Sequence, residues 1–175
     1  DGQNTDFGNS SFSFSEFNDS LYLTQAIFKD NKIDFSRSIF HGDVYFNSIE
    51  FKKHDGHYDT MINFYQSVFH KNLSLNKVSL DRLCVFDECQ FHGNLTLNDT
   101  TSNDIISFVN SSINNLTIST EESICFIEEL NLSTINLYGR VDIEGYTLNE
   151  IKAPFANFHE SSLLRIYDCN IKNLN

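Results

Sequence analysis

Large apolar residues recur along this chain at alternating intervals of five and six positions. The plainest copy is the segment 86–97, FDECQFHGNLTL, where large residues stand at Phe86, Phe91 and Leu97. Two positions before each of them is a smaller or aliphatic residue. The unit is eleven residues long and continues with few breaks from residue 7 to residue 171. A fixed period of this kind predicts a repeat architecture.

The pattern within each unit predicts short strands. Apolar residues alternate over three positions, as in segments 44–46 (VYF) and 95–97 (LTL), whereas an amphipathic helix needs apolar residues three and four positions apart. Short strands at a constant period indicate an all-β solenoid. Two units would form one four-sided coil, in which equivalent positions stack about 4.8 Å apart. The chain is long enough for about seven such coils.

Sorting residues by their position in the coil separates aromatic from aliphatic columns. One expected column contains Phe12, Phe35, Phe64, Phe86 and Phe108, and the next contains Phe17, Phe40, Phe69 and Phe91. The alternate units carry mostly Leu and Ile. Stacked rings bury large area and add favourable contacts of about 0.5–1.5 kcal/mol each. The separation favours a coil of two units over a coil of one.

Departures from the period predict where the coil is interrupted. We expect one solenoid domain over residues 1–175, with a loop extruded at 52–60 and a smaller loop near 119–123, because insertions in a solenoid must leave the coil. The single Pro leaves Asn, Asp and Ser to form the turns. The four cysteines lack paired metal-ligand spacing, and we expect buried free thiols.

The net charge of −12 argues against direct binding of nucleic acid or of an acidic membrane surface. Residues 83–139 contain no Lys or Arg, and within them we single out Asp87, Glu88, Glu121 and Glu122. Such a run is either solvated surface or an acidic flank that faces a partner. The sequence shows no membrane-spanning stretch and no signal peptide. The chain begins at Asp1 without Met, so we expect a trimmed, processed or partial chain; the compartment is not established, with the cytoplasm favoured.

Four histidines follow the large residue of one column directly. They are His41, His70, His92 and His159, and Asn114 and Tyr138 fill the two steps between the last two. We expect these residues to line up on one outer side, where they could contact a partner, bind an anion or metal, or respond to pH. The alternative is a polar turn position that repeats because the unit was duplicated.

The segment 52–60 contains four further candidates, His54, Asp55, His57 and Asp59. These residue types are possible metal ligands, but His-x-x-His alone is a weak motif, so we predict a contact loop and no metal site. The sequence contains no Gly-rich phosphate loop, nucleophile elbow or paired acid and base. We therefore expect neither an enzyme nor a cofactor.

The runs FHGDVYFNSIEF and VFDECQFHGNLTL resemble the Phe-rich branch of the pentapeptide-repeat family. The resemblance implies a right-handed quadrilateral β-helix with one central Leu or Phe and one small residue facing inward on each side. This chain departs from the family by having little Ala at the small position, which holds Ser15, Ser38, Ser67, Cys89, Ser111 and Cys169.

Two functions follow from the pattern and the resemblance. The first is a non-enzymatic rigid scaffold that mediates protein–protein interaction, with the partner unknown. The alternative is an acidic DNA mimic acting on a type II topoisomerase or another DNA-binding protein, since relatives of this kind exist in the family. The apolar ends of such a rod also predict end-to-end homodimerisation or flanking domains.

Overall fold

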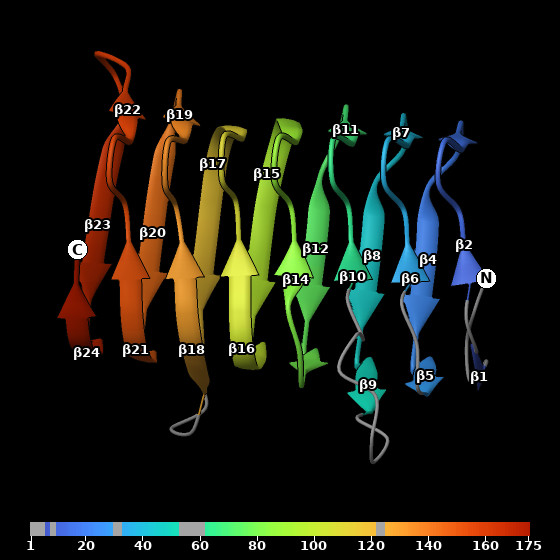
Figure 1. The fold of residues 1–175 in the computed structure, drawn as a ribbon, viewed down its shortest axis with the longest axis horizontal. Coiled ribbons are helices and arrows are strands. Elements are labelled where there is room, and N and C mark those ends of the chain that lie inside the picture. Colours follow the sequence, from blue (N-terminus) through green and yellow to red (C-terminus); the bar gives the residue numbers. More distant parts are fainter. Residues whose placement is uncertain (1–5, 8–9, 30–32, 53–61, 122–124) are drawn as a thin grey trace.

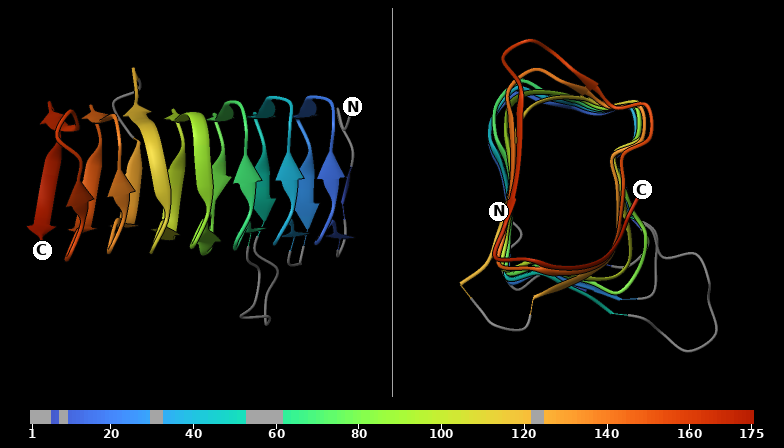
Figure 2. Two further views of the ribbon diagram at one scale, coloured as in Figure 1. Left: turned by 90° about the horizontal axis from the view of Figure 1, so that it is seen from above. Right: turned by 90° about the vertical axis from the view of Figure 1, so that its left-hand side faces the viewer.

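The chain winds into a coil of short parallel strands. The computed structural model describes residues 6–7, 10–29, 33–52, 62–121 and 125–175. These residues form strands and turns without any helix, so none of them belongs to a helix that could span a membrane. The front strands of Figure 1 run upward and the rear strands downward as the chain advances from N- to C-terminus, which makes the coil right-handed. The end view in Figure 2 shows its four-sided outline.

Each side of the coil is a parallel ladder, and the sides are numbered here by their first strand. Side 1 contains β1 (Asp6–Phe7), β5 (Ile27–Lys29), β9 (Glu50–Lys52), β13 (Ser79–Leu80) and the first parts of β16 (Thr101–Ser107), β18 (Phe126–Asn131), β21 (Thr147–Lys152) and β24 (Asn170–Leu174). Side 2 contains β2 (Ser10–Ser11), β6 (Ile33–Asp34), β10 (Ile62–Asn63), β14 (Cys84–Val85) and the last parts of β16, β18, β21 and β24.

The other two sides share two long strands that turn a corner. Side 3 contains β3 (Glu16–Phe17), β7 (Ile39–Phe40), β11 (Val68–Phe69), β19 (Asn136–Leu137), β22 (Asn157–Phe158) and the first parts of β15 (Gln90–Asn98) and β17 (Ser112–Ser119). Side 4 contains β4 (Leu21–Thr24), β8 (Val44–Asn47), β12 (Leu73–Asn76), β20 (Arg140–Glu144), β23 (Leu163–Tyr167) and the last parts of β15 and β17.

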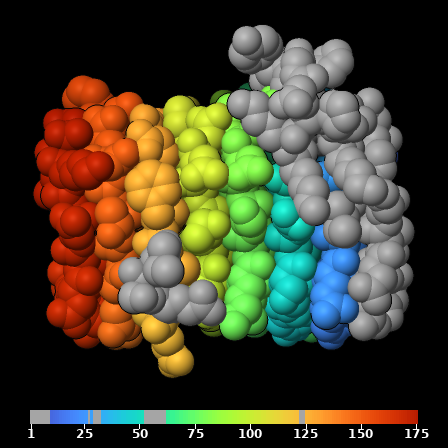
Figure 3. All heavy atoms as spheres, turned by 90° about the horizontal axis from the view of Figure 1, so that it is seen from below, coloured from blue at the N-terminus to red at the C-terminus, as the bar shows by residue number. Residues whose placement is uncertain are grey.

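The predicted quadrilateral β-helix is therefore confirmed. In the described part of the chain, side 4 is a ladder of seven strands, β4-β8-β12-β15-β17-β20-β23, whose first and last members are separated by six turns. Figure 3 shows successive coils as adjacent bands across one face of the molecule.

The aromatic columns form the core between sides 2 and 3. The first column stacks in the predicted order with ring centroids 5.0–5.1 Å apart, from Phe12 to Phe108. The second stacks at 4.8–4.9 Å, from Phe17 to Phe91. Both columns continue as aliphatic residues, for example Leu132. Parallel register places identical side chains at successive levels, which produces these stacks.

The inward serines complete the hydrogen bonding of the turns. The Ser67 hydroxyl donates to the Phe35 carbonyl (2.8 Å) and accepts from the Ser38 amide (3.1 Å), both one coil earlier. Ser111 makes the same two bonds to Phe86 and Cys89. These serines are fully buried. Serine at the small position therefore preserves the square coil, because it pairs backbone groups that the turn directs inward.

The corners use a wider range of residues than predicted. Twelve non-glycine residues of the described chain have positive φ, among them Arg37 and Thr134 as well as Asp99. Asp34 and Asn63 instead stand earlier in the turn, where each accepts the backbone amide two residues on. The prediction that Asn, Asp and Ser form the turns is thus right for these side-chain bonds but wrong for most left-handed positions.

The insertion before β18 shifts the column assignment by one residue. The repeat places Phe126 as the next large inward residue after Ile118, but Ile127 is fully buried and Phe126 is only half-buried. The register pairs Ser102 with Ile127, which explains the shift. Of the larger expected loop only Lys52 of β9 lies within the described residues, and residues 122–123 of the smaller loop lie outside them.

Candidate interaction surface

The histidine column lies along the outer edge of side 3, as the spacing predicts. His41 and His70 stack with ring centroids 4.9 Å apart, and His70 and His92 with centroids 5.4 Å apart. Tyr138 stacks on His159 at 4.1 Å. Whether these residues contact a partner stays a prediction.

The backbone holds these side chains in line. Each ring residue lies at or just beyond the end of a side 3 strand, and its amide donates to the coil before it. His41 donates to Phe17 (2.9 Å), and His159 donates to Leu137 (3.1 Å). The column is therefore as rigid as the ladder beneath it. His41 also bonds through Nε2 to Glu16 (2.8 Å).

At three levels the corner after the column leaves no room for a side chain. Gly42, Gly93 and Gly139 each follow a column residue. A Cβ atom on Gly93 would collide with the Lys71 carbonyl of the previous coil, and one on Gly139 with the Asn114 carbonyl. Glycine is needed here because adjacent backbones approach closely.

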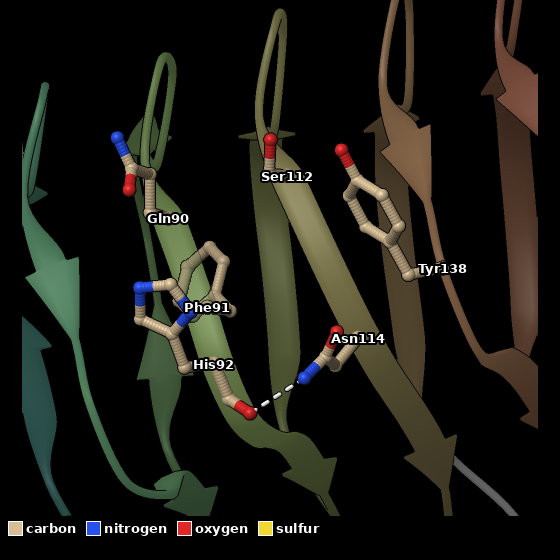
Figure 4. A pocket seen from close by; sticks show the side chains of 6 residues that line it. All are labelled: Gln90, Phe91, His92, Ser112, Asn114 and Tyr138. Carbon is tan, nitrogen blue, oxygen red and sulfur yellow. Dashed lines mark hydrogen bonds between the residues drawn. The ribbon is translucent and has the colours of Figure 1, made fainter.

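A depression of about 310 Å³ interrupts the column at its centre (Figure 4). It lies between His92 and Tyr138, at the level where Asn114 replaces a ring. Its lining is Gln90, Phe91, His92, Ser112, Asn114 and Tyr138. Gln90 and Ser112 were not singled out from the sequence. Their position two residues before a column residue is the signal that would have found them, because alternate residues of a strand face the same side.

Two of the acidic candidates, Asp87 and Glu88, lie at one corner and have side-chain partners within the chain. Asp87, at the corner of sides 2 and 3, accepts from the Ser107 hydroxyl (2.6 Å) and the Val109 amide (3.0 Å). Glu88 has positive φ and accepts from Gln66 (2.7 Å). Glu121 is exposed and lies beyond side 4.

The remaining candidates lie outside the described residues. They are His54, Asp55, His57, Asp59 and Glu122. Their use as contact residues stays a prediction.

A buried carboxylate on side 4 was missed by the sequence reasoning. Asp142 is 6% exposed and is held by the guanidinium groups of Arg140 and Arg165. The hydrogen bond from Arg165 (2.6 Å), with that from Arg140, lowers the pKa of Asp142 despite its burial. The signal was present in the ladder, because Asp142 and Arg165 are direct cross-strand neighbours.

Three other buried titratable groups, Cys84, Cys89 and Tyr146, lie in the core. Burial raises the pKa of the Cys84 and Cys89 thiols well above the usual value, so both stay protonated near neutral pH. All four cysteines are free. Burial likewise raises the pKa of Tyr146, whose hydroxyl accepts from the Thr100 amide (2.9 Å). No group of three or more His, Cys, Asp or Glu residues within the described ranges could hold a metal ion.

This architecture defines a β-solenoid repeat protein. A family model described as pentapeptide repeats (9 copies) matches residues 3–49. The strands beyond residue 49 continue the same ladders in register, for example from β8 to β12. The match over residues 3–49 supports the resemblance to the pentapeptide-repeat family, and the ladders carry the same coil beyond it. No curated protein and no solved structure matched it.

Proposed function

We propose that this protein is a non-enzymatic scaffold that binds another protein through the outer edge of side 3. The observation that carries the proposal is the line of exposed rings fixed at strand spacing, from His41 to His92 and from Tyr138 to His159. Ile39 on the same side is 37% exposed and Tyr138 is 46% exposed. Rigid exposed aromatic and apolar side chains cost little entropy to immobilise, which favours their use in interfaces.

The distribution of acidic groups supports a scaffold over the DNA-mimic alternative. A mimic needs unpaired negative charge along one face. Here Asp87 caps a turn, Glu129 pairs with Lys152 (2.7 Å), and Asp142 lies between two arginines on side 4. The net charge of −12 is the observation that favours mimicry. A gyrase supercoiling assay tests it, and unimpaired supercoiling at micromolar protein excludes mimicry of this kind.

Affinity capture with matched variants tests the scaffold proposal. The face variant replaces His41, His70 and His92 by Ala, and the control replaces Ser74, Thr96 and Thr117 by Ala on the outer face of side 4. We expect a protein that wild type and control retain and that the face variant binds at least about tenfold more weakly, a difference of ~1.4 kcal/mol. Purified partner and calorimetry then measure the affinity. Equal binding by both variants would contradict the assignment to side 3.

A further inference from the structure

The ring column of side 3 has one level without a ring. Register places Phe91, Ile113 and Leu137 at successive levels, so His92, Asn114 and Tyr138 follow at successive levels outside. Rings stack on both sides of this gap, at 5.4 Å from His70 to His92 and at 4.1 Å from Tyr138 to His159. The rings on either side of the gap, His92 and Tyr138, are therefore already held in place by stacking on His70 and His159.

The gap has the thickness of one planar ring. Two strand spacings separate the level of His92 from that of Tyr138, which is about 9.6 Å. A ring inserted midway would lie about 4.8 Å from each neighbour, which falls within the 4.1–5.4 Å separations of the column itself. Half-exposed Tyr138 uses one ring face on His159, which leaves the other for the gap.

A hydrogen bond to the backbone holds the Asn114 side chain in place, so this side chain does not fill the gap. Its Nδ2 donates to the His92 carbonyl (2.6 Å), and Figure 4 shows the side chain turned toward that carbonyl with Oδ1 left on the side of the depression. The coil is also one residue shorter here. The register passes from Phe91 opposite Ile113 to Asn94 opposite Asn115, so that two residues of β15 face a single residue of β17. The shorter corner and the small Ser112 side chain leave the space open.

The lining selects the class of ligand. Aromatic walls favour a planar ring, and Gln90, Ser112 and Asn114 place polar groups at its edge. The volume of about 310 Å³ lies at the lower end of small-molecule sites, so the ligand is small. No Lys or Arg occurs in residues 83–139, which disfavours a ligand that carries phosphate.

We propose that the depression between His92 and Tyr138 binds one aromatic side chain of a partner protein, with tyrosine as the best match to its polar edge. The partner's ring would complete the column. This assignment rests on the proposed function of side 3, and it specifies the anchor point of that surface. An aromatic anchor in a pocket is the usual centre of a protein interface.

The depression between His92 and Tyr138 is called the aromatic slot, or slot, from this point. Titration with N-acetyl-tyrosinamide, monitored by the amide NMR signals of the protein, tests whether the slot binds an aromatic ring. We expect saturable ring-current shifts confined to the amides of residues 90–92, 112–114 and 138. N-acetyl-leucinamide is the control ligand and should give no saturable shift there. Shifts spread over the surface, or equal shifts with the leucine compound, would overturn the assignment.

Two variants make the test specific. Asn114→His supplies the missing ring from the chain itself, so we expect it to fold with a melting temperature at or above wild type and to lose the saturable shifts. Thr117→His adds the same ring on side 4 of the same coil and should retain them. If Asn114→His fails to fold, Tyr138→Ala removes one wall and should weaken binding severalfold. Full tyrosinamide binding by a folded Asn114→His variant, or by Tyr138→Ala, would overturn the assignment of the slot.

The slot and the scaffold can fail separately. Absence of tyrosinamide binding, with partner capture still lost in the three-histidine variant, removes the slot alone. Tyrosinamide binding with no partner that depends on side 3 removes the proposed function and leaves the slot as a small-molecule site.

Discussion

The hydroxyl of an inward serine, rather than its small size alone, keeps the turn of each coil satisfied. At a left-handed corner the backbone leaves the ladder, and a carbonyl and an amide face the core. Ser38 and Ser67 each bridge such a pair from the preceding coil. Cys89 occupies the same column, and its thiol donates to the Phe64 carbonyl. This inward column therefore requires a side chain that is small and that donates a hydrogen bond. Residue size alone does not predict the second requirement.

Replacing Ser67 by Ala tests this role. The change leaves the Phe35 carbonyl and the Ser38 amide without their side-chain partner in the core, and we expect the free energy of unfolding to fall by about 2 kcal/mol. Ser67→Cys keeps a weak donor of the kind found at Cys89, so its loss should be less than about 1 kcal/mol. Urea denaturation measures both values. A loss below about 0.5 kcal/mol in Ser67→Ala would show that the hydroxyl hydrogen bonds contribute little, whereas equal larger losses would show that a thiol does not replace them.

At the scale of strands, an ion pair joins the last two strands of side 4, β20 and β23. Asp142 on β20 lies directly opposite Arg165 on β23 and also contacts Arg140 of its own strand. Arg165 lies over the Tyr167 ring at 5.8 Å from its centroid, and the Tyr167 hydroxyl donates to Glu144 (2.7 Å). These contacts tie β23 to β20 where few apolar residues are buried.

The Asp142 contacts predict a pH-dependent stability. Because the arginines lower the folded-state pKa of Asp142, its contribution is complete above the ordinary value of about 4 and is lost as pH falls through the lower folded value. Asp142→Asn should cost about 1–2 kcal/mol at pH 7, since both arginines are half-exposed and solvent screens them.

The same comparison at low pH supplies the control. Protonated Asp and Asn are similar in shape and charge, so the difference between wild type and Asp142→Asn should shrink toward zero as pH falls through the lowered folded-state pKa of Asp142. Denaturation curves taken from neutral pH down to the most acidic pH at which wild type still folds measure it. A double-mutant cycle with Arg165→Gln isolates the pair. A difference that stays constant with pH would contradict the assigned role of the charge.

The strands and columns could be predicted because one residue in every five or six is large and must be buried. That constraint fixed the order of the Phe columns and the alignment of His41, His70 and His92. The depression could not be predicted, because it depends on a corner shortened by one residue and on Asn114 bonding to a backbone carbonyl. The pairing of Asp142 with Arg165 could be derived from the register of β20 and β23, but the burial of Asp142 could not, because an outward position on a strand is ordinarily exposed.

At the scale of the whole molecule, the last coil of the solenoid exposes apolar residues whose equivalents in earlier coils are buried. Leu164 occupies the inward column of Val141, which is 1% exposed, yet Leu164 itself is 37% exposed. Phe158 is 46% exposed in the column where Leu137 is fully buried. Within the described residues β23 and β24 are edge strands, each paired with a neighbouring coil on one side. An apolar, unpaired edge favours association.

We therefore predict that this chain associates end to end through its last coil. A twofold contact between two such ends would bury the same patch on both copies. Leu164→Lys places a charge within the patch and should shift sedimentation velocity profiles toward the monomer at a given concentration. Asn157→Lys adds the same charge on the outer face of side 3 in the same coil and should leave association unchanged. Wild-type protein that stays monomeric at high concentration, or equal effects of the two variants, would show that the last coil does not carry the contact.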